Sequence, residues 1–227
     1  ASMGNLIASE TKERAYEVYK RVDFINYWLY TFTATCLLCL VEPFVAIWLG
    51  QDFVLTKAIL ILAVAIYYFK GINSGIDIAK NAAGLYYPDR FIPMAEAIAN
   101  MVISIVLAKR YGIAGVLFGT LVSFLALSFW AKPYFVCRDV FEVSFARYAV
   151  REGREIVVSV LVAAGTWYAV SLVSLENVLL SFGVKALLAL ALSNGLLLLV
   201  YFKTSEFQYL SGLLESAANR IGKREKA

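Results

Sequence analysis

The chain has 227 residues, of which 61% are hydrophobic and 17% are charged, and its formal net charge is +4. A mean hydropathy of +0.70 is far above that of a soluble domain, in which about half of the residues are apolar, and indicates an integral membrane protein. The sequence has no histidine, which excludes imidazole as a metal ligand, general base or pH switch, and we expect no metal site. Cys36 and Cys39 are expected to pack as small hydrophobic side chains.

Six apolar runs are long enough, at about 18 residues or more, to cross a hydrocarbon core of roughly 30 Å as helices. A transmembrane β-barrel would show shorter segments of alternating polarity, and runs such as residues 186–192 do not alternate. The sequence therefore predicts an all-α, polytopic bundle of six spanning helices, at residues 24–48, 53–80, 91–108, 111–131, 156–175 and 178–202.

Residues 1–8 look like the end of a preceding helix, so we expect the chain to be a fragment of a longer protein. Residues 9–23 are charged and predict a helical connection at the surface. Lysine and arginine gather in alternate connections, 16 on one side of the membrane against 4 on the other. Because positively charged loops remain in the cytoplasm, both ends of the chain are predicted to be cytoplasmic.

The second predicted span changes character along its length. It is apolar from residue 58 to residue 69, whereas the next twelve residues carry six polar side chains. At about 100° per residue, these six fall within an arc of roughly 120° and form a polar stripe: Lys70, Asn73, Ser74, Asp77, Lys80 and Asn81. Because lipid would leave the stripe unpaired, we expect it to line a polar cavity, with Asp77 orienting or neutralising Lys70. The alternative is that Lys70 only reaches toward the cytoplasmic membrane surface.

The later spans are less polar. In the third span, Glu96, Asn100 and Ser104 recur every four residues and predict a second polar stripe. Residues 134–155 carry four arginines among apolar residues and are expected to lie on an anionic leaflet, and the last two spans are expected to be peripheral. Glycines in and after the short link between the third and fourth spans are expected to allow close helix packing: Gly112, Gly115 and Gly119.

Three stretches together resemble one family. They are residues 2–8 followed by the charged connection, the sequence EPFVAIWLG at residues 42–50, and the block around Asn100 with YGIAGVLFGT at residues 111–120. In this order and spacing, they are similar to the C-terminal half of a polysaccharide flippase of the O-antigen transporter type. That family lies within the superfamily of multidrug, oligosaccharidyl-lipid and polysaccharide exporters.

The resemblance implies two six-helix lobes around a central cavity, with an extra helix pair at the C-terminus. Residues 1–155 would belong to the second lobe, and residues 156–227 would form the extra pair and a basic cytoplasmic tail. It also implies that undecaprenyl-diphosphate-linked oligosaccharides are moved by alternating access across the inner membrane of a bacterial or archaeal cell. The implied partners are the bilayer, the polyprenyl-linked glycan and the missing N-terminal half, without nucleic acid.

The residue types of both stripes fit such a substrate, because cations attract a diphosphate while amides and hydroxyls bind sugars. We expect no enzyme activity, no catalytic residue and no cofactor, with coupling to a proton or sodium gradient as a further possibility. The candidate substrate-binding residues are Lys70, Asn73, Ser74, Asp77, Lys80, Asn81, Glu96 and Asn100.

Two other functions remain open. An exporter of cationic compounds from the same superfamily would use acidic groups such as Asp77, Glu96 and Glu42 as the charge partner. A membrane enzyme acting on polyprenyl-linked sugars would need reactive groups on a large outer loop, and the outer connections here are only a few residues long. A scaffold without transport is disfavoured, because a central charge in a span costs about 2.5–3.5 kcal/mol.

Overall fold

A computed structural model describes the backbone of residues 3–212, and the side chains of that range except residues 3 and 8. This part of the chain is helical and contains no strand. The long helices are α2 (Lys12–Trp48), α3 (Lys57–Ala82), α4 (Ile92–Tyr111), α5 (Ile113–Ala126), α7 (Phe145–Ser171) and α8 (Val178–Tyr201). The shorter elements are α1 (Met3–Ser9), the 3-10 turn η1 (Gln51–Phe53), α6 (Ser128–Val136) and the π-helical turn η2 (Cys137–Phe141).

Within residues 3–212, six helical stretches are long and apolar enough to cross a membrane: α2, α3, α4, the joined stretch Ile113–Phe141, α7 and α8. This confirms the predicted all-α bundle with six candidate spans. Many large hydrophobic side chains on these helices remain exposed, as expected for a surface in contact with lipid.

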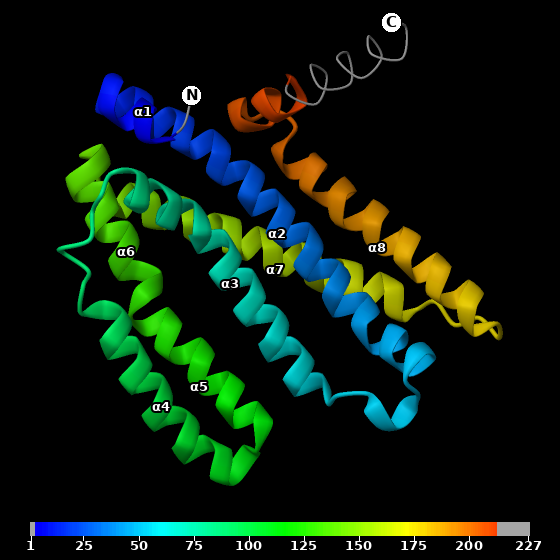
Figure 1. The fold of residues 1–227 in the computed structure, drawn as a ribbon. Helices are drawn as coiled ribbons and strands as arrows, with labels where there is room; N and C mark the ends of the chain where they lie inside the picture. The colour runs from blue at the N-terminus through cyan, green and yellow to red at the C-terminus, as the bar shows by residue number, and fades with distance from the viewer. Residues whose placement is uncertain (1–2, 213–227) are drawn as a thin grey trace, which may run out of the picture.

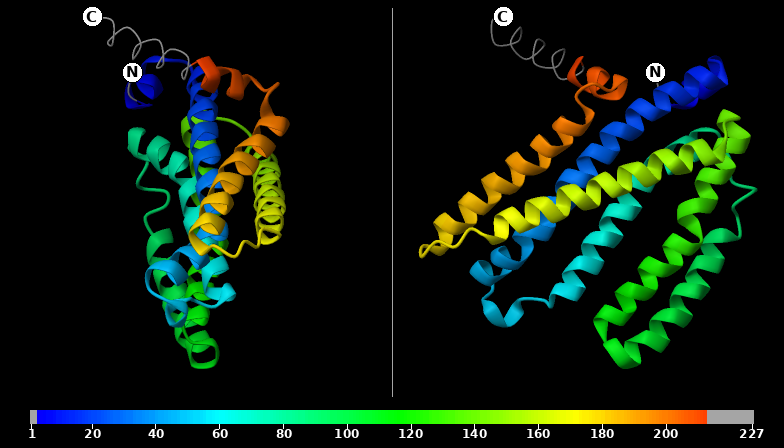
Figure 2. Two further views of the ribbon diagram at one scale, coloured as in Figure 1. Left: turned by 90° about the vertical axis from the view of Figure 1, so that its right-hand side faces the viewer. Right: turned by 180° about the vertical axis from the view of Figure 1, so that it is seen from behind.

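The helices are arranged around α2, which lies beside α3, α7 and α8 (Figures 1 and 2). Helices α4 and α5 form an antiparallel hairpin, and α5 packs against α3. The start of α2 and the end of α8 lie at the same end of the bundle (Figure 1). We call this the inner end, because the sequence predicts that it faces the cytoplasm.

Helix α2 is longer than the predicted first span. It begins at Lys12, where Thr11 Oγ1 accepts a hydrogen bond from the Arg14 amide (3.4 Å), and continues for 37 residues. At 1.5 Å per residue, it is about 55 Å long, well beyond the roughly 30 Å of a hydrocarbon core. The expected connection at residues 9–23 is thus helical from Lys12 onward. It is not wholly a surface element, because Tyr16 and Tyr19 are buried.

Helix α7 also begins earlier than expected, at Phe145 instead of Ile156. The prediction that residues 134–155 lie flat on a leaflet is wrong for the first turns of α7, where Glu152 and Glu155 are buried. The boundary expected between residues 155 and 156 falls within this helix. Helices α7 and α8 both pack on the central helix α2, so the pair is not merely peripheral.

The hairpin of α4 and α5 depends on small residues, as predicted. A Cβ at Gly115 would lie 2.5 Å from the Leu107 carbonyl carbon, and one at Gly119 would lie 2.9 Å from the Ser104 amide nitrogen. Glycine at both positions therefore allows the two backbones to approach closely. Gly112 has a different role, because its φ of 56° forms the turn between the two helices.

The cysteines pack as expected. Cys39 is buried with Val170 and Ala189, and Cys36 lies beside this cluster. All three cysteines of the chain are free. Core packing therefore accounts for the C-x-x-C spacing.

Candidate functional site

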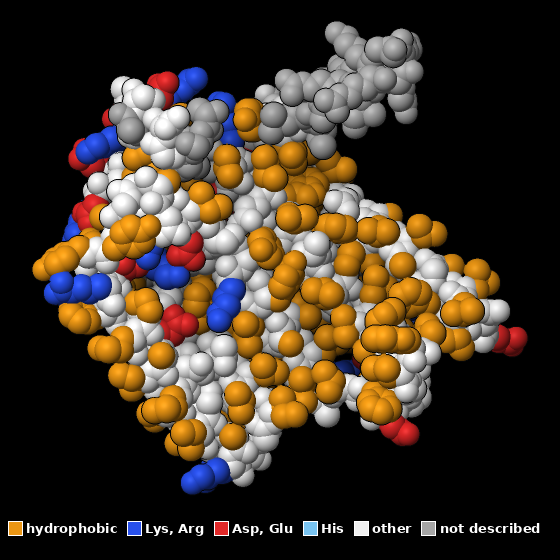
Figure 3. Space-filling view, in the orientation of Figure 1, with side chains coloured by type: hydrophobic (Ala, Val, Ile, Leu, Met, Phe, Trp, Pro, Cys, Tyr) orange, Lys and Arg blue, Asp and Glu red, His pale blue; other side chains and the backbone are white. Residues whose placement is uncertain are grey.

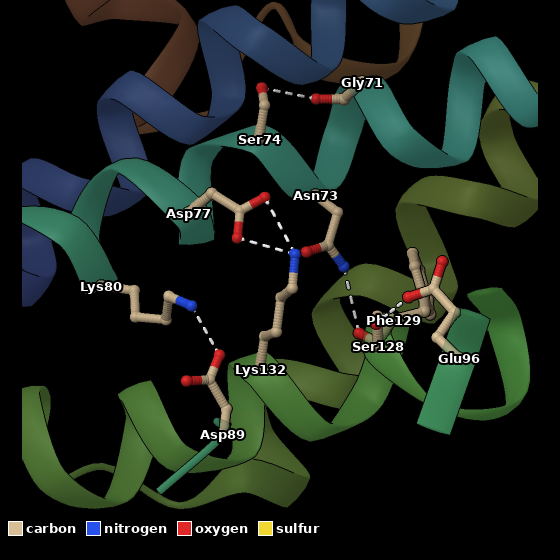
Figure 4. Close-up of polar contacts among 10 residues, drawn as sticks. All are labelled: Gly71, Asn73, Ser74, Asp77, Lys80, Asp89, Glu96, Ser128, Phe129 and Lys132. Carbon is tan, nitrogen blue, oxygen red and sulfur yellow. Dashed lines mark hydrogen bonds and ion pairs between the residues drawn. The ribbon is translucent and has the colours of Figure 1, made fainter. Parts of the chain in front are cut away.

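The polar stripe occupies the inner half of α3, and its members differ in exposure. Lys70 and Asn81 are exposed, Asn73 is buried, and the other three side chains are partly buried. Figure 4 shows that several of them point toward different neighbours. Residues that share one face of the predicted helix therefore contact several different elements in the folded bundle.

One edge of the stripe packs against α2. Ser74 Oγ donates a hydrogen bond to the Gly71 carbonyl (2.7 Å). Asn26 Nδ2 of α2 donates to the same carbonyl (2.9 Å) and to Ser74 Oγ (3.2 Å). The helices approach closely here, since a Cβ at Gly75 would lie 2.5 Å from Asp23 Oδ1. These contacts set the position of α3 relative to α2.

Asn73 faces α6 and satisfies a backbone group there. Its Nδ2 donates to the Phe129 carbonyl at 3.1 Å (Figure 4). In a regular helix this carbonyl would accept from residue 133, but Pro133 has no N–H to donate. Asn73 thus supplies the hydrogen bond that the proline cannot. Its own Oδ1 is buried and has no hydrogen-bond partner among the described residues.

Two ion pairs flank the stripe. Lys132 Nζ of α6 lies 2.9 Å from Asp77 Oδ1, and Lys80 Nζ lies 2.5 Å from Asp89 Oδ2 in the connection between α3 and α4. Asp89 is only 3% exposed. The expected pairing of Asp77 with Lys70 is therefore wrong, because Lys132 reaches this carboxylate instead.

Lys70 keeps an uncompensated charge. Within residues 3–212, no carboxylate lies at ion-pair distance from its ammonium. Its ammonium lies near the ring of Phe124, with Nζ 5.7 Å from the ring centroid. This ammonium, near the middle of a candidate span, is therefore exposed at the surface of the described helices.

The second stripe connects α4 to its neighbours. Ser128 Oγ donates to Glu96 Oε2, while Asn100 Oδ1 accepts from Ser104 Oγ (2.8 Å) and Thr120 Oγ1 (3.3 Å). The two stripes meet at the start of α6, where the adjacent residues 128 and 129 bond Glu96 and Asn73 respectively (Figure 4). Glu96 and Asn100 therefore contribute to helix packing in this structure.

The charged surface is local. Figure 3 shows lysine, arginine and acidic side chains gathered over the inner ends of α3 and α6. The surface over α4, α5 and α8 on the same face is mostly hydrophobic, apart from charges near the helix ends. The charged side chains on this face are therefore confined to one region, and the expectation that the first stripe lines a polar cavity stays a prediction.

An apolar pocket lies on the side of α3 away from the polar stripe. A pocket of about 370 Å³ lies between α2, α3 and α7, and α3 contributes Leu60, Val64 and Tyr68 to it. At about 100° per residue, these positions are opposite the polar stripe. Lys70 and Asn81 instead face outward, so an enclosed cavity at the stripe would need a wall from beyond the described helices.

Sequence reasoning missed a buried charged cluster formed by Asp23 of α2 with Arg151, Glu152 and Glu155 of α7. Arg151 Nη2 donates to Asp23 Oδ2, and its Nε lies 3.9 Å from Glu155 Oε1. Their charge predicts a surface location for both segments, and the structure buries them instead. The available signal was helical periodicity, since Glu152 and Glu155 continue the buried face of the span: Ser159, Val162, Thr166 and Val170.

Comparisons with protein-family models, curated proteins and solved structures gave no match. The family resemblance of the sequence therefore stays a prediction. The function has to be argued from the site itself.

Proposed function

We propose that this protein is a membrane transporter that moves undecaprenyl-diphosphate-linked oligosaccharides across a bacterial or archaeal cell membrane by alternating access. The observation that carries the proposal is the exposed, uncompensated ammonium of Lys70 beside a polar stripe in a candidate span. A charge near the middle of a span costs about 2.5–3.5 kcal/mol on insertion scales, which favours contact with water or an anionic substrate over contact with lipid.

The surrounding groups support an anionic cargo. The carboxylates of the stripes are already engaged, since Asp77 is bound by Lys132 and Glu96 by Ser128. Lys70 has no such partner, and Asn81 presents an exposed amide about three helical turns further toward the inner end. An exporter of cationic compounds would need open carboxylates at the stripes, so the charges there favour a diphosphate over a cation. Glu42 of α2, the third acid that such an exporter could use, is exposed and lies outside both stripes.

Alternating access requires contacts that can open and close. The ion pairs from Asp77 to Lys132 and from Lys80 to Asp89 join α3 to α6 and to the connection before α4. Such pairs can exchange a carboxylate for a phosphate as the substrate passes. We infer that the open side of the stripe is covered by further helices, in line with the first lobe that the resemblance implies.

A reconstitution experiment tests the proposal. Proteoliposomes containing the protein together with the first lobe that the resemblance implies would carry a fluorescent undecaprenyl-diphosphate oligosaccharide, and an added impermeant glycosidase would report how fast the inner-leaflet sugar reaches the outside. We expect movement that depends on the protein, and none for a cationic dye. Transport of the dye without the lipid-linked sugar would contradict the proposal and support the exporter of cationic compounds.

The proposed orientation has its own test. In intact cells, a cysteine placed at Gln51 in η1 should react with a membrane-impermeant thiol reagent, whereas one at Glu142 near the inner end should not. Both positions are exposed at opposite ends of candidate spans. The reverse labelling pattern would invert the orientation.

A further inference from the structure

The apolar pocket between α2, α3 and α7 reaches the end of the bundle opposite the inner end, where α2 ends and α3 begins (Figure 1). Its lining there includes Glu42 in the last turns of α2, Lys57 at the start of α3 and Trp167 near the end of α7. Along α2 the lining extends from Thr31 to Glu42, which is about 16 Å at 1.5 Å per residue. This is roughly half of a hydrocarbon core of about 30 Å, so the pocket has the depth of one membrane leaflet.

The interior of the pocket suits hydrocarbon. The hydroxyl groups at its deep end bond one another, since Tyr68 Oη donates to Ser159 Oγ (2.9 Å), which also lies 2.7 Å from Thr31 Oγ1. Most of the remaining lining is apolar, and two of its members, Ile61 and Val160, are 55% and 60% exposed. The pocket therefore offers few free polar groups in its depth and is open toward the surrounding lipid.

Two opposite charges lie at the mouth of the pocket. Glu42 and Lys57 are both exposed, and within residues 3–212 neither side chain forms an ion pair, with the other or with a third residue. Lys57 Nζ lies 5.9 Å from the ring centroid of Trp167, a residue type that is common at membrane surfaces. Because a lysine ammonium binds phosphate and a carboxylate binds an ammonium group, the mouth is complementary to a zwitterion.

We propose that the pocket binds one membrane phospholipid with a phosphoethanolamine headgroup. One acyl chain enters the pocket, the phosphate contacts Lys57 and the ammonium contacts Glu42. This inference does not rest on the proposed transport. Phosphocholine has no N–H group to donate to Glu42, and phosphoglycerol has no cation at all. A polyprenyl diphosphate would place negative charge beside Glu42 without a cation to pair with it.

Photocrosslinking tests the proposal. The protein would be placed in phosphatidylcholine nanodiscs with a small fraction of phosphatidylethanolamine that carries a diazirine in one acyl chain, and mass spectrometry of peptides would locate the labelled residues. We expect stronger labelling of the pocket lining on α3 and α7 than of Met101, an exposed residue of α4. Unlabelled phosphatidylethanolamine should compete, whereas phosphatidylglycerol and undecaprenyl diphosphate should compete about tenfold less, because they lack the ammonium.

Charge variants connect the labelling to the headgroup. Lys57→Gln and Glu42→Gln should each reduce it about tenfold, which corresponds to the loss of one charge-assisted hydrogen bond. Lys109→Gln and Asp52→Asn are the matched controls, because they remove exposed charges at the same end of the bundle that do not line the pocket. Both controls should label as strongly as the unchanged protein.

A size variant connects the labelling to the pocket itself. Ala164 lines the pocket and is exposed, so Ala164→Phe should fill the space and abolish labelling without displacing a buried neighbour. Ala97→Phe, at an exposed position of α4, should have no effect. Labelling of the pocket no stronger than that of α4, equal competition by phosphatidylglycerol or undecaprenyl diphosphate, or unchanged labelling in both charge variants would overturn the proposal.

Discussion

Two helix interfaces in this bundle are held together by different chemistry. Helices α2 and α7 meet through polar groups, including the ion pair of Arg151 with Asp23 and the hydrogen bond between Thr31 Oγ1 and Ser159 Oγ (2.7 Å). Helices α4 and α5 approach closely mainly because Gly115 and Gly119 have no side chain at the contact. Both interfaces solve the same problem, because lipid provides no hydrophobic drive for helices to associate.

The comparison shows how each interface fails. At the α2–α7 interface, removing one group leaves its partner buried without compensation. At the α4–α5 hairpin, adding a single methyl group forces two backbones apart. The α2–α7 interface is therefore most sensitive to the removal of a polar group, and the α4–α5 hairpin to the addition of a methyl group.

The largest effect is expected for Asp23→Ala. This change removes the hydrogen-bonded partner of Arg151, whose side chain is only 15% exposed, and leaves Glu155 at 3.9 Å as its remaining ion pair, so we expect a loss of about 3 kcal/mol of unfolding free energy, the lower end for a broken buried pair. Reversible unfolding in bicelles would measure the loss. A double variant, Asp23→Ala with Arg151→Met, should lose clearly less than the sum of the two single changes, and strict additivity would argue against the pair as the source of the effect.

A smaller effect is expected at the hairpin. Gly115→Ala places a methyl group against the Leu107 backbone and should cost about 1–3 kcal/mol. Gly195→Ala in α8 is the matched control, because nothing lies within 4 Å of a Cβ there. The control should be neutral or gain up to about 1 kcal/mol from helix propensity. Equal responses of both variants would show that close packing does not hold the hairpin.

The smallest effect concerns a hydroxyl at the α3–α7 contact. Tyr68→Phe removes the hydrogen bond from Tyr68 Oη to Ser159 Oγ (2.9 Å) and keeps the ring in place. Hydrogen bonds between membrane helices average about 0.6 kcal/mol, so we expect a loss of roughly 0.5–1 kcal/mol. Tyr168→Phe, at an exposed position of α7, should change nothing measurable. A loss above 2 kcal/mol would show that the Tyr68 hydroxyl contributes more than a single hydrogen bond between two helices.

The six spans could be predicted because the length of an apolar run can be read from the sequence without knowing which helices pack beside it. The glycine packing of the hairpin followed from local spacing in the same way. Partners could not be predicted, since helical periodicity places Asp77 and Lys70 on one face but does not reveal that Lys132 of α6 lies closer to the carboxylate.

The charged cluster was missed for a related reason. Charge density predicts a surface location, although Glu152 and Glu155 lie on the face of α7 that also carries the buried Ser159 and Thr166. Periodicity indicates the buried face, but the partner on it, Asp23, lies 128 residues from Arg151 in sequence and cannot be identified from local spacing. Local patterns therefore identified polar faces but not the helices that those faces meet.

The most direct test of the proposed substrate contact is a substitution series at Lys70 in the proteoliposome assay, at equal protein abundance. If the ammonium attracts the diphosphate, Lys70→Arg should retain much of the transport, Lys70→Ala should lose at least tenfold, and Lys70→Glu should lose nearly all. A lysine that only reaches the membrane surface would tolerate alanine. Transport by Lys70→Ala close to that of the unchanged protein would contradict the account.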